Sequence, residues 1–170
     1  TFLVLGGLYA SYLPEIALSQ CPADAAVLGE GEVTLVQLAA AVAEGAPLAK
    51  VSGLCYRRHN SFFRSAPRAP VMNIDALEWP AYDLLDFDAY RLPPTRAVSH
   101  GRVSSVLSAR GCNFNCSFCS HHYGYFCHIR ARDPEDVVEE MRHVARMYAV
   151  KEFRFEDCAF TAVPERAKKI

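Results

Sequence analysis

Three cysteines stand close together in this chain, and their spacing restricts what the surrounding residues can form. Cys112, Cys116 and Cys119 follow the pattern C-x3-C-x2-C, shortly after the apolar run 103–107. One short loop can therefore present three thiolates to a single inorganic centre, one fewer than a closed four-ligand iron–sulfur or zinc site uses. A centre held in this way keeps one corner open. Our working hypothesis is an open [4Fe–4S] cluster that binds and cleaves a nucleoside cofactor.

Two other interpretations fit the same spacing. A structural zinc site would take His121 or His122 as its fourth ligand, and three buried thiols would bind no metal at all. The spacing alone does not separate zinc from the open cluster, so the context of the loop has to decide. The remaining cysteines are interpreted as ordinary thiols: Cys21, Cys55, Cys127 and Cys158.

Composition and charge exclude several classes of protein. The chain has a formal net charge of −1 and no basic block, which argues against nucleic acid or an anionic membrane as a partner. No apolar run approaches the roughly 18 residues of a membrane span. The 7 cysteines are odd in number and clustered, which favours a cytoplasmic metal protein over a secreted disulfide framework. Because the sequence starts at Thr1 within an apolar run, we interpret it as an internal fragment.

The first fifty residues alternate between strand and helix patterns. The expected elements are strands 2–5 and 24–28 and helices 13–19 and 32–44. This order is typical of a parallel α/β sheet, whose ligands lie beyond the carboxyl ends of the strands. Gly6-Gly7 and Gly29-Glu30-Gly31 fall at two such ends. On the helix 32–44, the expected buried stripe consists of Leu35, Leu38, Ala39 and Val42.

Residues 51–100 do not continue the strand–helix alternation. Runs 51–58 and 61–64 predict a hairpin, and several prolines follow. Trp79, Tyr82 and Leu85 are too apolar to be left in water. We therefore expect a linker that packs on its neighbours.

The α/β alternation resumes after residue 100. The pattern predicts a strand at 103–107, then the cysteine loop, a helix opened by Asp133 and Pro134, and a strand at 151–155. The second strand ends in Glu156-Asp157. These elements fit the first units of a β/α barrel, whose sites lie at the carboxyl ends of its strands.

The run from Ser108 to Cys119, with Phe118 just before the last cysteine, resembles the cysteine loop of the radical S-adenosylmethionine (SAM) enzymes. Residues 130–140 and 153–157 also resemble the first helix and second strand of that family. Upstream, the resemblance is to the cobalamin-binding domain and linker of its B12-binding branch. It rests on Gly6-Gly7, Pro14-Glu15, Asp24, residues 29–32 and residues 80–86.

The resemblance implies an α/β fold in three parts. Residues 1–50 would be the C-terminal part of a Rossmann-like cobalamin-binding domain, and residues 51–100 a linker with a hairpin. Residues 101–170 would form the first β/α units of a partial, TIM-like radical SAM barrel.

The family also implies roles for individual residues. Cys112, Cys116 and Cys119 would bind three irons of a [4Fe–4S] cluster, and SAM would chelate the fourth iron. Phe118 would lie beside the adenine, and Glu156 or Asp157 would receive the SAM amino group. Contacts with cobalamin would come from Gly6, Gly7, Gly29, Glu30 and Gly31.

We therefore expect a cobalamin-dependent radical SAM enzyme that transfers a methyl group to an unactivated carbon or phosphorus of a small-molecule substrate. It would need an electron donor of the flavodoxin or ferredoxin kind. This piece by itself is expected to be inactive, because most of the barrel lies outside it. One alternative is a radical SAM methylthiotransferase acting on tRNA or a ribosomal protein. That class uses three further upstream cysteines, where only Cys21 and Cys55 are present. The other is a non-catalytic zinc-binding module.

Overall fold

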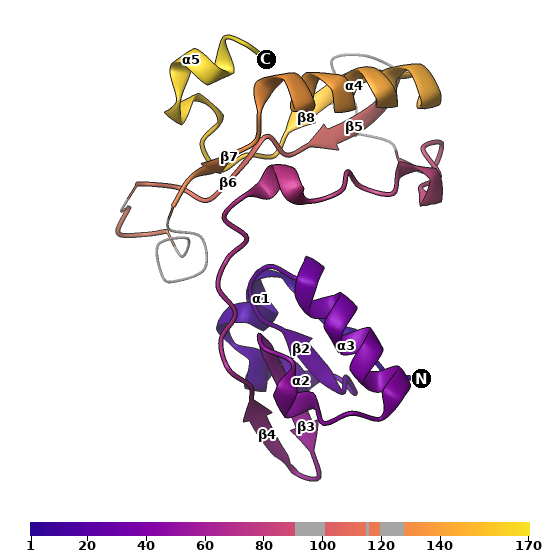
Figure 1. Cartoon of the computed structure of the whole chain (residues 1–170), viewed down its shortest axis with the longest axis vertical. Helices are drawn as coiled ribbons and strands as arrows, with labels where there is room; N and C mark the ends of the chain where they lie inside the picture. Colours follow the sequence, from indigo (N-terminus) through magenta and orange to yellow (C-terminus); the bar gives the residue numbers. More distant parts are fainter. Residues whose placement is uncertain (91–100, 115, 120–127) are drawn as a thin grey trace. The chain divides into compact units, whose positions relative to one another are not determined.

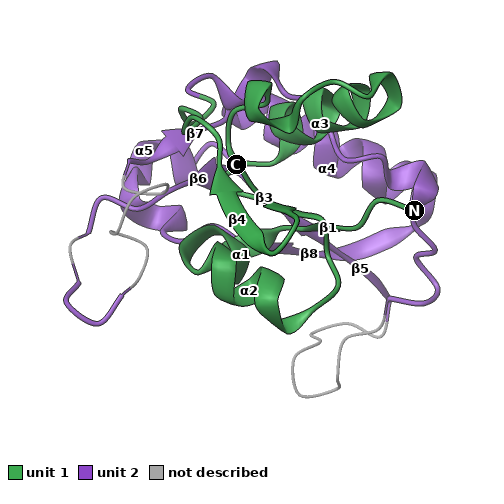
Figure 2. Ribbon diagram, turned by 90° about the horizontal axis from the view of Figure 1, so that it is seen from below, with its two compact units in different colours: residues 1–71 green, residues 72–170 purple. Residues whose placement is uncertain are grey.

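The computed structural model of the chain describes residues 1–90, 101–114, 116–119 and 128–170 (Figure 1). The chain forms two compact units, Thr1–Val71 and Met72–Ile170 (Figure 2). His121, His122 and Cys127 lie outside the described residues. Within the described ranges, no helix is both long enough and apolar enough to cross a membrane.

The first unit is a four-stranded sheet with helices packed on it. Its elements are β1 (Val4–Leu5), α1 (Gly7–Tyr12), α2 (Pro14–Gln20), β2 (Ala25–Val27), α3 (Glu32–Glu44), the 3-10 turn Leu48–Lys50, β3 (Leu54–Arg58) and β4 (Ser61–Arg64). The strand order is β1-β2-β3-β4, with β1 and β2 parallel and the other pairs antiparallel. The predicted strand–helix alternation is confirmed. Helix α1 was not predicted, because the glycine pair at its start indicates a turn.

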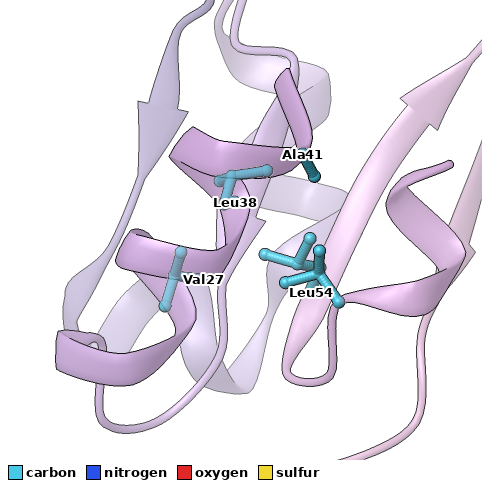
Figure 3. Close-up of a cluster of buried hydrophobic side chains, with 5 residues drawn as sticks. Val27, Leu38, Ala41 and Leu54 are labelled. Carbon is cyan, nitrogen blue, oxygen red and sulfur yellow. The ribbon is translucent and has the colours of Figure 1, made fainter. Parts of the chain in front are cut away.

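Helix α3 buries a different face from the one that the sequence predicted. Thr34, Leu38 and Ala41 are buried, whereas Leu35 and Val42 are 48% and 39% exposed. The helix is apolar around most of its circumference, so periodicity alone did not select the buried face. That face is set by the sheet, because Leu38 and Ala41 pack with Val27, Val51 and Leu54 (Figure 3).

Leu38 allows a direct test of this core. The side chain is 2% exposed, so Leu38→Ala should lower the free energy of unfolding by about 2–5 kcal/mol, through lost burial and the cavity that remains. Val36→Ala on the same helix is the matched control, because Val36 is 71% exposed and should change stability little. Urea denaturation of both variants measures the difference; equal effects would contradict this packing.

The predicted hairpin belongs to the first unit. Strand β3 pairs with β2 through Ala25↔Tyr56, Ala26↔Cys55 and Val27↔Leu54. Arg64 on β4 forms a two-pronged ion pair with Glu15 of α2 at 2.6 and 2.7 Å, and this hydrogen bonding lowers the pKa of Glu15. These contacts put the boundary between the two units after Val71, whereas the sequence suggested a separate stretch from 51 to 100.

The second unit is built on two parallel strands. Its elements are β5 (Arg102–Val106), β6 (Ala109–Arg110), β7 (Arg130–Ala131), α4 (Pro134–Tyr148), β8 (Val150–Phe155) and α5 (Pro164–Ala167), with 3-10 turns at Ile74–Ala76, Tyr82–Leu84 and Phe160–Ala162. β5 and β8 pair in parallel, and β6 and β7 pair antiparallel. The Asp133 side chain caps α4 by accepting from the Glu135 backbone N–H at 2.7 Å, as predicted. A strand, loop, helix and parallel strand therefore follow in the predicted order.

Residues 72–90 belong to the second unit and pack on the rest of it. Tyr82 and Phe87 are buried in a cluster with Val144 of α4 and Val150 of β8. The indole N–H of Trp79 donates to Asp136 at 3.1 Å. Trp79 and Tyr82 pack on their neighbours as expected, whereas Leu85 stays 39% exposed. The packed residues bring this segment alongside the parallel strand pair.

Candidate functional site

The three cysteines lie on the loop between β6 and β7. Gly111 starts this loop with a φ of 88°, a left-handed conformation that favours glycine, so the chain turns directly before Cys112. The Asn113 side chain accepts a hydrogen bond from the Ile129 backbone N–H at 3.0 Å and links the two ends of the loop. Cys112, Cys116 and Cys119 are all free thiols and partly buried. The structure thus presents three thiols on one loop with a fixed base.

The base of the loop is held by a buried carboxylate. The Asp157 side chain is 1% exposed. Its Oδ1 accepts from the backbone N–H groups of Ser108 and Ala109 at 2.7 and 3.1 Å, and its Oδ2 accepts from the Ser108 hydroxyl. Arg166 of α5 lies 3.8 Å from the same Oδ2 and donates to the Ser108 carbonyl oxygen. Asp157 therefore joins the end of β8 to the start of the cysteine loop.

A second buried network of hydrogen bonds and ion pairs connects helix α4 to the base of the cysteine loop. Glu140 is 2% exposed and accepts from the Tyr82 hydroxyl and from the Arg132 guanidinium. Burial raises the pKa of Tyr82, and the hydrogen bond to Glu140 raises that pKa further. Arg132 also pairs with Asp136, and it donates to the Leu107 carbonyl oxygen at 3.1 Å and from its backbone N–H to Ser108 at 2.9 Å. Glu140 lies between the buried Val137 and Val144 on the helix, and the sequence analysis did not single it out.

Glu156 differs from its neighbour Asp157. It is exposed at the carboxyl end of β8, and its Oε1 accepts from the Ser105 hydroxyl of β5 at 3.3 Å. It also lines a pocket on the sheet face that carries Ser105 and Arg154. Its carboxylate is therefore available to a ligand.

The end of β8 lies next to the cysteine loop. Desolvation raises the pKa of the Cys158 thiol, and the neighbouring Cys112 and Cys119 thiols raise it further. Phe118, within the loop, is 90% exposed. The structure thus brings the end of β8 close to Cys112 and Cys119, and it leaves the Phe118 ring exposed on the same loop.

Comparison with known proteins identifies this arrangement. Residues 106–170, which contain the loop, α4 and β8, match the model of the radical SAM superfamily. Residues 106–170 belong to the radical SAM superfamily. The family predicted from the cysteine loop is confirmed.

Relatives match over nearly the whole chain. An uncharacterized methyltransferase of Pyrococcus horikoshii is 36% identical over 98% of this chain and 35% of its own length. The anaerobic magnesium-protoporphyrin IX monomethyl ester cyclase of Rubrivivax gelatinosus is 31% identical over 91% of this chain and 28% of its own length. The radical SAM methyltransferase TsrM from Kitasatospora setae, solved with cobalamin and a [4Fe–4S] cluster bound, superposes with a TM-score of 0.69 at 24% identity, over 97% of this chain and 32% of TsrM. The chain thus spans about a third of the length of these proteins.

Three thiols on one loop are the ligand set that an open [4Fe–4S] cluster uses. Among the described residues, no three His, Cys, Asp or Glu side chains are close enough to bind one ion. In a [4Fe–4S] cluster each thiolate binds a different iron, so the ligand sulfurs stand farther apart than the ligands of one zinc. The three free thiols of one loop suit the cluster. The histidines that a zinc site would use lie outside the described residues.

The first unit brings its two glycine segments together. The Ser11 hydroxyl donates to the Gly7 carbonyl oxygen at 2.8 Å and accepts from the Gly29 backbone N–H at 2.9 Å. A side-chain carbon added at Gly6 or Gly7 would meet no atom within 4 Å, so that backbone has open space beside it. Glu30 turns toward its own unit and accepts from the Val71 N–H at 2.8 Å, while Gly31 caps α3. Ser11 was not predicted, because a serine beside a glycine pair carries no distinctive signal.

Proposed function

We propose that this chain forms part of a cobalamin-dependent radical SAM enzyme that transfers a methyl group. The observation that carries the proposal is the loop of three free thiols, braced by Asp157 beside the exposed carboxylate of Glu156. Cys112, Cys116 and Cys119 would hold the [4Fe–4S] cluster. The cluster supplies the electron that cleaves SAM reductively, and an electron-donor protein has to reduce it.

Glu156 rather than Asp157 is the proposed acceptor for the SAM amino group. Both were candidates in the sequence, but the Asp157 carboxylate is buried and already accepts three hydrogen bonds from Ser108 and Ala109. Among the described residues, the carboxylate of Glu156 accepts only a long hydrogen bond from Ser105, and it faces a pocket. Phe118 offers an exposed ring on the loop, which suits stacking on the adenine.

Unit 1 is proposed to be the end of a cobalamin-binding domain. Its support is the open space beside Gly6 and Gly7, together with the likeness to a methyltransferase solved with cobalamin. Gly29 lies near Gly7, because its backbone N–H donates to the Ser11 hydroxyl, which in turn donates to the Gly7 carbonyl oxygen. Glu30 and Gly31 border that segment, and their contact with the cofactor is part of the proposal.

A small molecule with an unactivated carbon or phosphorus is the proposed methyl acceptor. The relative named as a methyltransferase favours methyl transfer, and the relative named as a cyclase shows that similar chains also occur in an enzyme of another reaction. The sequence alternative of a zinc-binding module gains no support from the described residues.

Replacing Glu156 tests the proposed SAM site. Glu156→Gln in the full-length protein, reconstituted anaerobically with iron, sulfide and cobalamin, should raise the KM for SAM by about tenfold or more, because a charged hydrogen bond is lost. Cluster absorption should stay unchanged. Glu165→Gln is the control, since Glu165 forms only an exposed ion pair with Lys168. Methionine released from SAM is the readout, and an unchanged KM would remove Glu156 from the site.

A further inference from the structure

A pocket opens on the sheet face beside Glu156. Its volume is about 340 Å³, and it lies between β5, β8 and the 80–90 segment. Ser105 and Arg154 are direct neighbours in the parallel pairing, and Glu156 follows Arg154 on the same side of β8. The sheet thus gives the pocket a polar floor with a hydroxyl, a guanidinium and a carboxylate.

Arg154 has no protein partner in this pocket. It is partly buried, and in the described parts of the chain its guanidinium forms no hydrogen bond or ion pair, unlike Arg132 and Arg166. Glu156 points to Ser105 instead. A carboxylate or phosphoryl group matches the donors of such a guanidinium with two parallel hydrogen bonds.

The opposite wall of the pocket is apolar. Leu85 and Tyr90 belong to the 80–90 segment and keep 39% and 56% of their surface exposed, while Tyr82 and Phe87 close the wall behind them. Val103 extends this surface on β5. A ligand that fills the pocket would place an anionic group on Arg154 and a ring or hydrocarbon body against these side chains.

We infer that Arg154 binds the anionic group of the methyl-acceptor substrate, a small organic carboxylate, phosphonate or phosphate with an apolar body. The inference rests on the proposed function, in which Glu156 binds the amino group of SAM. SAM also carries a carboxylate. Arg154 lies two residues before Glu156, about 6–7 Å farther from the strand end that approaches the cysteine loop. That distance favours the substrate over SAM as the source of the anion.

The test uses benzoate and phenylphosphonate as probes, with benzamide as the neutral match, and measures binding to the full-length protein by calorimetry. The wild type should bind both anions at least tenfold more tightly than benzamide. Arg154→Gln should remove this preference, while Arg154→Lys should keep part of it. Arg142→Gln is the control, because Arg142 lies 63% exposed on α4.

The affinity for SAM and the cluster spectrum separate the outcomes. Both should be the same in Arg154→Gln as in the wild type. Weaker SAM binding in this variant would assign Arg154 to the SAM carboxylate and overturn the inference, as would anion binding that does not depend on Arg154 or is absent from the wild type. Failure of the protein to bind iron would contradict the proposed function, whereas the anion measurement needs no cluster. A far-UV spectrum confirms that the variants fold.

Discussion

Alanine in place of any one of Cys112, Cys116 and Cys119 should abolish the [4Fe–4S] cluster of the full-length protein. Three thiolates already leave one iron without a protein ligand, so two are too few to hold the cluster. Anaerobic reconstitution with iron and sulfide should give cluster absorption in the wild type and none in the variants. Methionine release from SAM should fall to background.

Cys21→Ala is the matched control for these variants. Cys21 is also a free, partly buried thiol, but it lies in the first unit. Its replacement should leave the absorption and the iron content unchanged. Retention of the cluster by all three loop variants would contradict the assignment of the loop.

Alanine in place of Asp157 should destabilise the second unit and lower its cluster content. The change leaves two backbone N–H groups without an acceptor and Arg166 without its buried counter-charge. Breaking a buried ion pair on one side costs about 3–5 kcal/mol. Urea denaturation and iron analysis measure the two effects. Asp157→Asn should be milder, because an amide oxygen still accepts from Ser108 and Ala109.

The control for Asp157 is Asp88→Ala. Asp88 pairs with Arg102 at 2.8 Å, but its side chain is 60% exposed, and exposed pairs contribute about 0–1 kcal/mol. Asp157→Ala with normal stability and a normal cluster, but a raised KM for SAM, would show that Asp157 binds SAM and does not brace the loop.

Local patterns predicted the elements better than the contacts between them. Helix α4 was predicted from the Asp133 cap and Pro134 at its start. The buried face of α3 could not be predicted from periodicity, because a helix that is apolar on most sides contains no signal for the sheet beneath it. The pairing of β3 with β2 joins residues far apart in the chain, so the hairpin was predicted but its place in the sheet was not.

In the candidate site too, the sequence predicted the local elements but not the contacts between them. The cysteine spacing indicated the loop, and the order of elements placed Glu156-Asp157 at the end of the second strand. Only the three-dimensional contacts distinguish the two acids, since one is buried among donors and the other faces a pocket. Arg154 is one polar residue in an alternating strand, and nothing in the sequence shows that it lacks a partner.

The electron paramagnetic resonance spectrum of the reduced cluster, with and without SAM, tests the central claim most directly. The claim is that three cysteines of one loop hold a cluster whose fourth iron is open to SAM. The spectrum of the reconstituted full-length protein should change when SAM is added, and Glu156→Gln should need more SAM for the same change. A cluster whose spectrum does not respond to SAM, or a protein that contains zinc and no iron, would contradict the claim.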